Sequence, residues 1–337
     1  MSAVPQLDRR IALAHLPTPL EPLDRLGAHL GMAPGRLWVK RDDLTGLGGG
    51  GNKARKLEYL CADALARGCD TLVTGGGRQS NHVRITAAAA NRLGLHCTIV
   101  VNSVRPDEPT GNVLLDELLG PEIVWIDRNG PELDYYGIEA AIADACTRLA
   151  AGGRHPYAMP IGGASAVGAL GYVRAGIELW SQDPSFDVVV VADGSGGTHA
   201  GLVAGLGDHR MVYGVDVGAR PDVAARIAPK AAEVARLAGL AEPTGDPGPD
   251  GLPVAVVDHD HFGPDYGAAT DECLEAMRLA ARLEGLLLDP VYTGKAMVGL
   301  LEGVRRRRIP VDARVLFLHT GGLPALFAEG YGAWVRS

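Results

Sequence analysis

The 337-residue chain has the composition of an ordinary globular protein, with 47% hydrophobic and 21% charged residues. Its formal net charge of −8 argues against a nucleic-acid or anionic-membrane partner, and no apolar run is long enough to span a membrane. The five cysteines are scattered without a C-x-x-C pair, which indicates neither a disulfide framework nor a zinc site. Charges and a proline within Met1–Arg10 do not fit a secretory signal, so we expect a cytoplasmic protein.

Strands and helices alternate along the first half of the chain. After an extended, proline-punctuated entry at Leu16–Leu20, the pattern predicts a strand over Leu37–Lys40. The predicted elements that follow are a helix over 53–67, a strand over 71–74, a helix opened by Gly75–Gly77 from near Ser80, a strand over 98–101, a helix over 111–119, a strand over 123–126 and a helix over 138–151.

A second alternating series begins near residue 160. Its predicted elements are a helix over 165–180, a strand over 188–191, a turn over 193–198 that opens a helix, a strand over 212–217, helices over 221–237 and 270–284, a short helix from Gly294 and a strand over 315–318. The all-valine strand Val188–Val191 is typical of a parallel sheet buried on both faces. We therefore predict an α/β fold of two open, twisted, mostly parallel sheets with a ligand in the cleft between two domains.

A run of glycines, Gly48–Gly51, leads directly into the helix that begins at Lys53. Glycine lets the backbone approach a ligand closely, and the helix N-terminus places Lys53 beside free N–H groups that disfavour an ammonium. The setting predicts a lowered pKa for Lys53, which suits Schiff-base chemistry with a carbonyl cofactor. The alternative is a solvated surface lysine that follows a flexible loop.

A second glycine-rich segment, Gly194-Ser195-Gly196-Gly197-Thr198, lies between a buried strand and a helix. Its N–H groups, the helix N-terminus and two hydroxyls are suited to bind a phosphate, although a structural turn without ligand explains it equally well. The segment lacks the G-x-G-x-x-G spacing of a dinucleotide fingerprint and the G-K-[ST] ending of a P-loop.

Three further motifs precede helices. Gln79–His82 contains Ser80, a natural N-cap residue, and Asn81, which could donate to a cofactor or a carboxylate. Asp289–Lys295 and His319–Gly322 offer hydroxyls and backbone N–H groups late in the chain. None of the ten histidines has metal-ligand spacing, so we expect no metal.

Together these motifs resemble one family, that of D-cysteine desulfhydrase and 1-aminocyclopropane-1-carboxylate (ACC) deaminase. Its members use pyridoxal phosphate and share the tryptophan-synthase-β fold. The matching segments stand in the family's order, from about Leu16 to about Phe327: Gly50–Glu58, Gln79–His82, Gly194–Thr198, Asp289–Lys295 and His319–Gly322.

The resemblance implies a role for each matching residue. Lys53 is the lysine that binds the cofactor, and it or a tyrosine acting with Ser80 removes the α-proton. The implied catalytic residues are Lys53, Ser80, Tyr266 and Tyr292. The implied cofactor-binding residues are Lys53, Lys56, Asn81, Gly194, Ser195, Gly196, Gly197, Thr198, Thr293 and Thr320. The expected substrate-binding residues are Ser80, Asn81, His82, Tyr292 and, as a departure from the family pattern, Arg78.

Two positions bear on the substrate. ACC deaminases have a glutamate directly after the tyrosine that matches Tyr292 and a leucine at the position of Thr320, whereas this chain has Thr293 and Thr320. A neutral hydroxyl near the pyridine nitrogen suits β-elimination of a good leaving group better than ring opening. Arg78 could bind an additional anionic group such as a sulfonate, or it could point outward into solvent.

The resemblance thus implies β-elimination from D-cysteine to pyruvate, ammonia and hydrogen sulfide. L-cysteate sulfo-lyase and ACC deaminase are the alternatives within the family, and a dinucleotide-dependent oxidoreductase or a non-catalytic pyridoxal-phosphate-binding protein are the alternatives outside it. The expected large domain combines residues 1–52 with 162–337, and the expected small domain spans 53–161. A homodimer is the family expectation.

Overall fold

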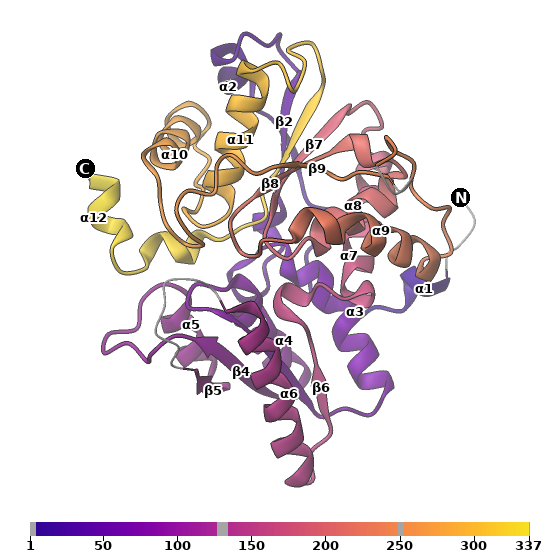
Figure 1. The fold of residues 1–337 in the computed structure, drawn as a ribbon, viewed down its shortest axis with the longest axis vertical. Coiled ribbons are helices and arrows are strands. Elements are labelled where there is room, and N and C mark those ends of the chain that lie inside the picture. Colours follow the sequence, from indigo (N-terminus) through magenta and orange to yellow (C-terminus); the bar gives the residue numbers. More distant parts are fainter. Residues whose placement is uncertain (1–4, 127–133, 249–252, 337) are drawn as a thin grey trace.

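The computed structural model describes residues 5–126, 134–248 and 253–336. Figure 1 shows two α/β parts, one above the other, with the N- and C-termini at opposite sides of the upper part. The helices are α1 (Pro5–Asp8), α2 (Asp24–His29), α3 (Lys53–Ala66), α4 (Asn81–Leu93), α5 (Asn112–Leu119), α6 (Tyr135–Ala151), α7 (Ala166–Gln182), α8 (Gly197–Leu206), α9 (Val223–Leu237), α10 (Asp271–Glu284), α11 (Thr293–Arg305) and α12 (Tyr331–Arg336).

The strands form two separate sheets. They are β1 (Leu20–Pro22), β2 (Leu37–Lys40), β3 (Thr71–Gly77), β4 (His96–Asn102), β5 (Glu122–Trp125), β6 (Pro156–Ala158), β7 (Val188–Asp193), β8 (Val212–Asp216), β9 (Val256–Asp258) and β10 (Val315–Leu318). The six-stranded sheet has the order β1-β2-β10-β7-β8-β9, and only the β1–β2 pair is antiparallel. The four-stranded sheet, β5-β4-β3-β6, is entirely parallel. The predicted α/β fold with two mostly parallel sheets is confirmed.

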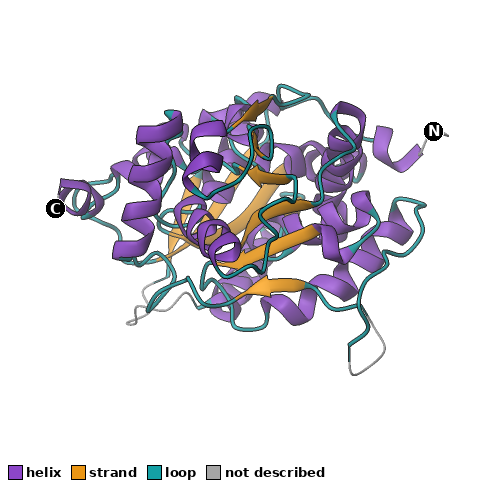
Figure 2. Ribbon diagram, turned by 90° about the horizontal axis from the view of Figure 1, so that it is seen from above, coloured by secondary structure: helices purple, strands orange, loops and turns teal. Residues whose placement is uncertain are grey.

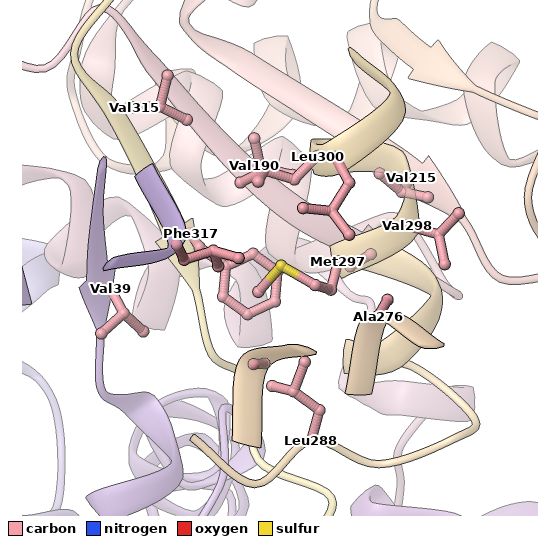
Figure 3. Close-up of a cluster of buried hydrophobic side chains, with 14 of the residues drawn as sticks. Val39, Val190, Val215, Ala276, Leu288, Met297, Val298, Leu300, Val315 and Phe317 are labelled. Carbon is pink, nitrogen blue, oxygen red and sulfur yellow. The ribbon is translucent and has the colours of Figure 1, made fainter. Parts of the chain in front are cut away.

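Helices surround the strands (Figure 2), and alternating residues of the six-stranded sheet belong to two different cores. Val190 and Phe317 pack in a core with residues of α10 and α11, whereas their neighbours Val191 and Leu316 pack in another core with residues of α7, α8 and α9. Figure 3 shows the first of these cores, with Phe317 at its centre beside Met297. Fully burying one such side chain contributes about 1.5–3 kcal/mol, so both faces of the sheet must be covered.

Most predicted elements agree with the structure within a few residues, and the differences have identifiable causes. Gly75–Gly77, expected to open a helix, instead extend β3. A Cβ on Gly75 would lie 2.6 Å from Cγ2 of Ile138, and one on Gly76 would lie 2.6 Å from Oγ of Ser80, so these glycines let α6 and α4 approach the strand. The helix expected to be short near Gly294 is α11, which begins at Thr293 and has 13 residues.

The strands β1, β6 and β9, each of three residues, were not predicted because segments this short carry no hydrophobic period. The whole four-stranded sheet lies between Thr71 and Ala158, inside the expected small domain. Helix α3 packs against both α7 and α4, so it connects the two parts of the molecule. The domain boundaries at 52/53 and 161/162 therefore remain a prediction. No described helix is long and apolar enough to cross a membrane.

Candidate active site

A cavity that opens to solvent lies between the two sheets and is lined by residues from both; its empty space is about 690 Å³ with the solvent at its mouth included. Gly76 and Gly77 come from the carboxyl end of β3, and Ala192 and Asp193 come from the carboxyl end of β7. The first residues of α3 and α4 and the loop before α8 complete much of the wall. Such a position, at the carboxyl ends of parallel strands, is where open α/β sheets bind their ligands.

Lys53 lies in the cavity wall as the first residue of α3. Two hydrogen bonds hold the backbone that leads into Lys53. The Thr45 hydroxyl accepts from the N–H of Gly51 at 2.8 Å, and the N–H of Asn52 donates to the carbonyl of Thr320 at 2.9 Å. Burial lowers the pKa of Lys53 to about 8. The predicted direction is therefore found, and its largest cause is removal of Lys53 from water.

The 194–198 loop lies beside Lys53 and precedes α8. Gly196 is in the left-handed conformation at φ +75° as the N-cap of α8, and no side chain caps that helix end. The first N–H groups of α8 therefore have no side-chain partner and are available to an anion. Nδ2 of Asn52 donates to Oγ1 of Thr198 at 3.1 Å, which ties the loop to the start of α3.

The segment Ser80–His82 forms the cavity wall at the start of α4. Ser80 is both a capping and a lining residue, because its Oγ accepts from the N–H of Val83 at 3.4 Å. His82 is buried with no hydrogen-bond partner on either ring nitrogen. Burial, together with Lys53 and Lys56, holds the pKa of His82 well below its usual range, so the ring is neutral at physiological pH.

Two tyrosines from distant segments meet in the cavity. The hydroxyls of Tyr266 and Tyr292 hydrogen bond to each other, and burial raises the pKa of both phenols. The carboxylate of Asp289 accepts from the N–H groups of Val291, Tyr292 and Thr293, each at 2.9 Å, and thereby shapes the turn that carries Tyr292.

The loop that carries Tyr266 is held by a buried lysine. Nζ of Lys295 donates to the carbonyls of Phe262, Asp265 and Val217 at 2.7, 3.1 and 3.3 Å. These three contacts satisfy its three N–H groups, although burial lowers the pKa of Lys295 to about 8.

The structure brings most of the expected site residues together. Those that line the cavity are Lys53, Ser80, Asn81, His82, Gly194, Ser195, Gly196, Thr198, Tyr266, Tyr292 and Thr320. Lys56 and Gly197 were also expected in the site but do not line the cavity. Lys56 lies behind the 194–198 loop, where a Cβ on Gly197 would be 3.1 Å from its Nζ.

Thr293 and Arg78 likewise do not line the cavity. The hydroxyl of Thr293 donates to Oδ1 of Asp289 at 2.6 Å and accepts from the Asp289 N–H at 2.8 Å, so it belongs to the turn and not to the cavity wall. Arg78 requires a correction, because its side chain is 41% exposed and pairs with Glu329 at 3.6 Å. The outward orientation is the one found, since water solvates a guanidinium better than this cavity would.

Sequence reasoning missed several supporting residues. Arg84 is fully buried and donates to Oδ1 of Asn81 and to the carbonyl of Gly50, both at 2.9 Å. An arginine at the start of an alanine-rich helix, one turn after Asn81, was the available signal. Asp289 and Lys295 belong to a motif that we singled out for its hydroxyls. Asp289 shapes the turn through N–H groups of its close neighbours in the chain, whereas the role of Lys295 depends on carbonyls that are distant along the chain.

A second cavity, which we call the vestibule, adjoins the first and shares Tyr135, Ser195 and Gly196 with it. Its lining includes Arg220, Arg226, Lys230 and Glu139. The two arginines pair with Asp222, and Lys230 pairs with Glu233.

One group of side chains in the described part of the chain has a spacing that could suit a metal ion: Asp258, Asp260 and His261. The guanidinium of Arg308 already lies against both carboxylates, at 3.2 and 2.9 Å. None of these residues lines the cavity that contains Lys53.

Comparison with known proteins adds independent information. A family model described as "Pyridoxal-phosphate dependent enzyme" matches residues 11–321. The chain is 44% identical over 331 residues, 95% of both chains, to a protein of Yersinia enterocolitica named D-cysteine desulfhydrase, and 43% identical over the same share to one of Yersinia pestis.

Solved structures show the same fold. A structure described as an ACC deaminase homologue superimposes with a TM-score of 0.85 at 37% identity, covering 97% of this chain and 95% of the other. Threonine deaminase isoform 2 from Solanum lycopersicum superimposes with a TM-score of 0.63 at 17% identity, covering 99% of this chain and 84% of the other. At that identity the second likeness bears on the fold alone.

Proposed function

The chain belongs to the family of pyridoxal-phosphate-dependent enzymes, and from this membership we propose that it is a carbon–sulfur lyase acting on D-cysteine. Elimination of the thiol would give pyruvate, ammonia and hydrogen sulfide. The observation that carries the proposal is the similarity, over nearly the whole of both chains, to proteins named D-cysteine desulfhydrase.

The residues around the cavity fit this cofactor. The uncapped N-terminus of α8 and the hydroxyls of Ser195 and Thr198 suit a phosphate group. Lys53, with a pKa lowered to about 8, suits reaction with an aldehyde. Asn81 and Thr320 offer an amide and a hydroxyl to a polar aromatic ring between them and the loop.

When bound, pyridoxal phosphate supplies an electron-withdrawing ring that stabilises negative charge at the α-carbon of an amino acid. Lys53 would hold the cofactor and, once released by the substrate amine, would act as the base at the α-proton. Its lowered pKa matches that task, because an amine of ordinary pKa would be almost fully protonated at pH 7.

The tyrosine pair would act on the leaving group. Because burial raises the pKa of both phenols, Tyr266 and Tyr292 keep their protons at neutral pH and can donate. A proton from this pair to the departing sulfur would prevent return of the thiolate. The hydroxyl of Ser80 and the start of α4 would bind the substrate carboxylate.

The lining of the cavity favours cysteine over cysteate. Among the described lining residues there is no arginine, and Arg78, the cation expected to bind a sulfonate, points away and pairs with Glu329. A second negative charge on the substrate would therefore lack a partner. The cavity wall presents the neutral hydroxyl of Thr320, and the residue directly after Tyr292 is Thr293 and not a glutamate. Both features support elimination over opening of the ACC ring.

We also propose that the protein is a cytoplasmic homodimer. All five cysteines are unpaired, which suits a reducing compartment. Leu114 and Leu118 lie one turn apart on α5 with 51% and 80% of their surfaces exposed, and such exposed apolar side chains are commonly covered by a second subunit. Sedimentation equilibrium of the purified protein tests the dimer: a monomer at micromolar concentration would contradict it.

The activity is tested by incubating purified holoprotein with D-cysteine, L-cysteine, L-cysteate and ACC, and measuring sulfide, sulfite, pyruvate and 2-oxobutyrate. We expect sulfide and pyruvate in equal amounts from D-cysteine. The variant Lys53→Ala is the control and should release neither product above background. Sulfite from cysteate or 2-oxobutyrate from ACC as the dominant product would overturn the substrate assignment, and no product at all would indicate a non-catalytic binding protein.

A further inference from the structure

Two lysines one helical turn apart converge on a single glycine. Lys53 and Lys56 both belong to α3, and Lys56 is fully buried. Nζ of Lys56 donates to the carbonyl of Gly162 at 3.1 Å, and a Cβ on Gly162 would lie 3.7 Å from Nζ of Lys53. The two amino groups are close enough to interact with each other. Because Gly162 has no side chain, the space between the two amino groups stays open.

The surroundings of the pair do not accommodate two positive charges. The carboxylate of Asp193 raises the pKa of Lys56, but its Oδ2 already lies 2.7 Å from Nδ1 of His199. His82, on which the charges of both lysines act, is buried and neutral. Burial and the charge of Lys53 hold the pKa of Lys56 well below its usual range, whereas the pKa of Lys53 is lowered only to about 8. With the cavity free of anions, the proton therefore stays mainly on Lys53.

That distribution is the wrong one for binding an aldehyde, because only a neutral amine is a nucleophile. The position of Lys56 against the 194–198 loop could reverse this distribution of the proton. A Cβ on Gly197 would lie 3.1 Å from Nζ of Lys56, so the 194–198 loop passes directly against this nitrogen. An anion seated in the loop would favour the charged form of Lys56 more than that of Lys53.

We propose that Lys53 and Lys56 share one proton, and that a phosphate group in the 194–198 loop draws this proton onto Lys56 and leaves Lys53 as a free amine. The inference rests on the proposed role of Lys53 in binding the cofactor. The transfer runs from Nζ to Nζ, so no proton is taken from or given to solvent. The free amine then forms its bond to the aldehyde carbon, and the aldehyde oxygen leaves as water. The cofactor's own phosphate thus prepares the residue with which its aldehyde reacts.

The size of the effect is bounded. An amine with a pKa of about 8 is neutral in roughly one molecule in ten at pH 7. Complete transfer of the proton to Lys56 can therefore accelerate the reaction at pH 7 by at most about tenfold. The acceleration should disappear near pH 9.5, where Lys53 is already neutral without help.

The experiment uses apoprotein and pyridoxal, which carries the aldehyde but no phosphate. The rate at which pyridoxal forms its adduct with the protein is followed by absorbance at pH 7 and pH 9.5, with inorganic phosphate or with sodium chloride at equal ionic strength. We expect phosphate to raise the rate at pH 7 by several-fold and to have no effect at pH 9.5. A phosphate effect of equal size at both pH values, or none at pH 7, would overturn the inference.

Two variants separate proton sharing from simple attraction of anions. In Lys56→Met, Lys53 no longer has a neighbouring amine to stabilise its ammonium, so the rate without phosphate should equal or exceed that of the wild type and phosphate should not change it. Lys230→Met, in the vestibule, removes a cation near the loop but away from Lys53, and should keep the acceleration. Acceleration retained in Lys56→Met, or lost in Lys230→Met, would contradict proton sharing. If Lys56→Met does not fold, the pH dependence of the wild type still decides.

Failure of the proposed function looks different. If Lys53→Ala forms the same adduct with pyridoxal phosphate as the wild type, Lys53 is not the attachment site and the proposed function fails. If the adduct requires Lys53 but its rate ignores phosphate, only the inference fails.

Discussion

Nη1 of Arg84 donates to Oδ1 of Asn81 at 2.9 Å, one turn away on α4. Nδ2 of Asn112 donates to the same oxygen at 3.1 Å, so the carbonyl end of the Asn81 amide is occupied on the protein side. The NH₂ end is left for the cavity, where Asn81 can donate to an acceptor on the bound molecule. A buried guanidinium thus decides what Asn81 recognises.

Replacement of Arg84 tests this relationship. In Arg84→Met the buried oxygen of Asn81 loses a charged donor, which costs about 1–3 kcal/mol, and the amide is free to turn. We expect the affinity for pyridoxal phosphate to fall about tenfold or more and the melting temperature to drop. The control is Arg92→Met, an exposed arginine on the same helix, which should change neither. Unchanged cofactor affinity in folded Arg84→Met would contradict the role.

Gly162 and Gly94 form a matched pair, because their φ angles are +68° and +69°. A Cβ on Gly162 would lie 2.6 Å from Oγ of Ser195, whereas one on Gly94 would meet no atom within 4 Å. Gly94→Ala should lose about 1–2 kcal/mol of stability and keep its activity. Gly162→Ala should lose similar stability and also bind the cofactor at least about tenfold more weakly, because Ser195 must move. Equal cofactor affinities, measured by absorbance titration, would show that the position tolerates a side chain.

The tyrosine pair is expected to act as one unit. Tyr292→Phe and Tyr266→Phe should each lower kcat for D-cysteine by about 10²–10³-fold while the cofactor stays bound, since each removes a proton donor and leaves the ring. Because the two hydroxyls hydrogen bond to each other, the double variant should be little slower than either single variant. Losses that multiply in the double variant would show independent roles.

The pKa of Lys53 predicts a pH dependence of apoprotein stability. The folded value of about 8 lies below the ordinary value, so the unfolded chain binds more protons between about pH 8 and 10.5, and the stability contribution of Lys53 rises with pH across that window. Below pH 8 the cost of the buried charge is constant. Apoprotein Lys53→Met, which has no charge to bury, should be more stable than wild type at pH 7 by up to about 3 kcal/mol, and this advantage should shrink toward pH 10.

Urea unfolding of both apoproteins at pH 7, 8.5 and 10 measures this difference. Lys230→Met, which removes a lysine from the vestibule, serves as the comparison and should follow the wild type at every pH. If the difference in unfolding free energy between Lys53→Met and the wild type does not change with pH, burial does not lower the pKa of Lys53.

Arg78→Ala should leave KM and kcat unchanged within about twofold for both D-cysteine and L-cysteate. Its guanidinium is exposed and pairs with Glu329, and exposed ion pairs contribute little. A rise in KM confined to cysteate would show that the side chain turns toward the cavity when substrate binds.

The sequence was sufficient for those features that depend on local pattern. Alternation of apolar strands with amphipathic helices is a property of neighbouring residues, and it predicted the two parallel sheets. The glycine runs predicted where backbone N–H groups would be free, and Ser80 predicted where they would be capped. The resemblance to a known family placed Lys53, the 194–198 loop and the tyrosines within one site, and the structure brings them to one cavity.

Tertiary structure alone decided which side chains face that cavity and which hold it in shape. Thr293 is in the expected motif but is bound by Asp289, and Arg78 is next to the expected substrate loop but is turned to solvent. Arg84 and Lys295 gain their roles from partners contributed by other segments. The pKa of Lys53 is likewise set by the loss of water around it. Burial and distant contacts are produced only when the chain packs, and no local pattern contains them.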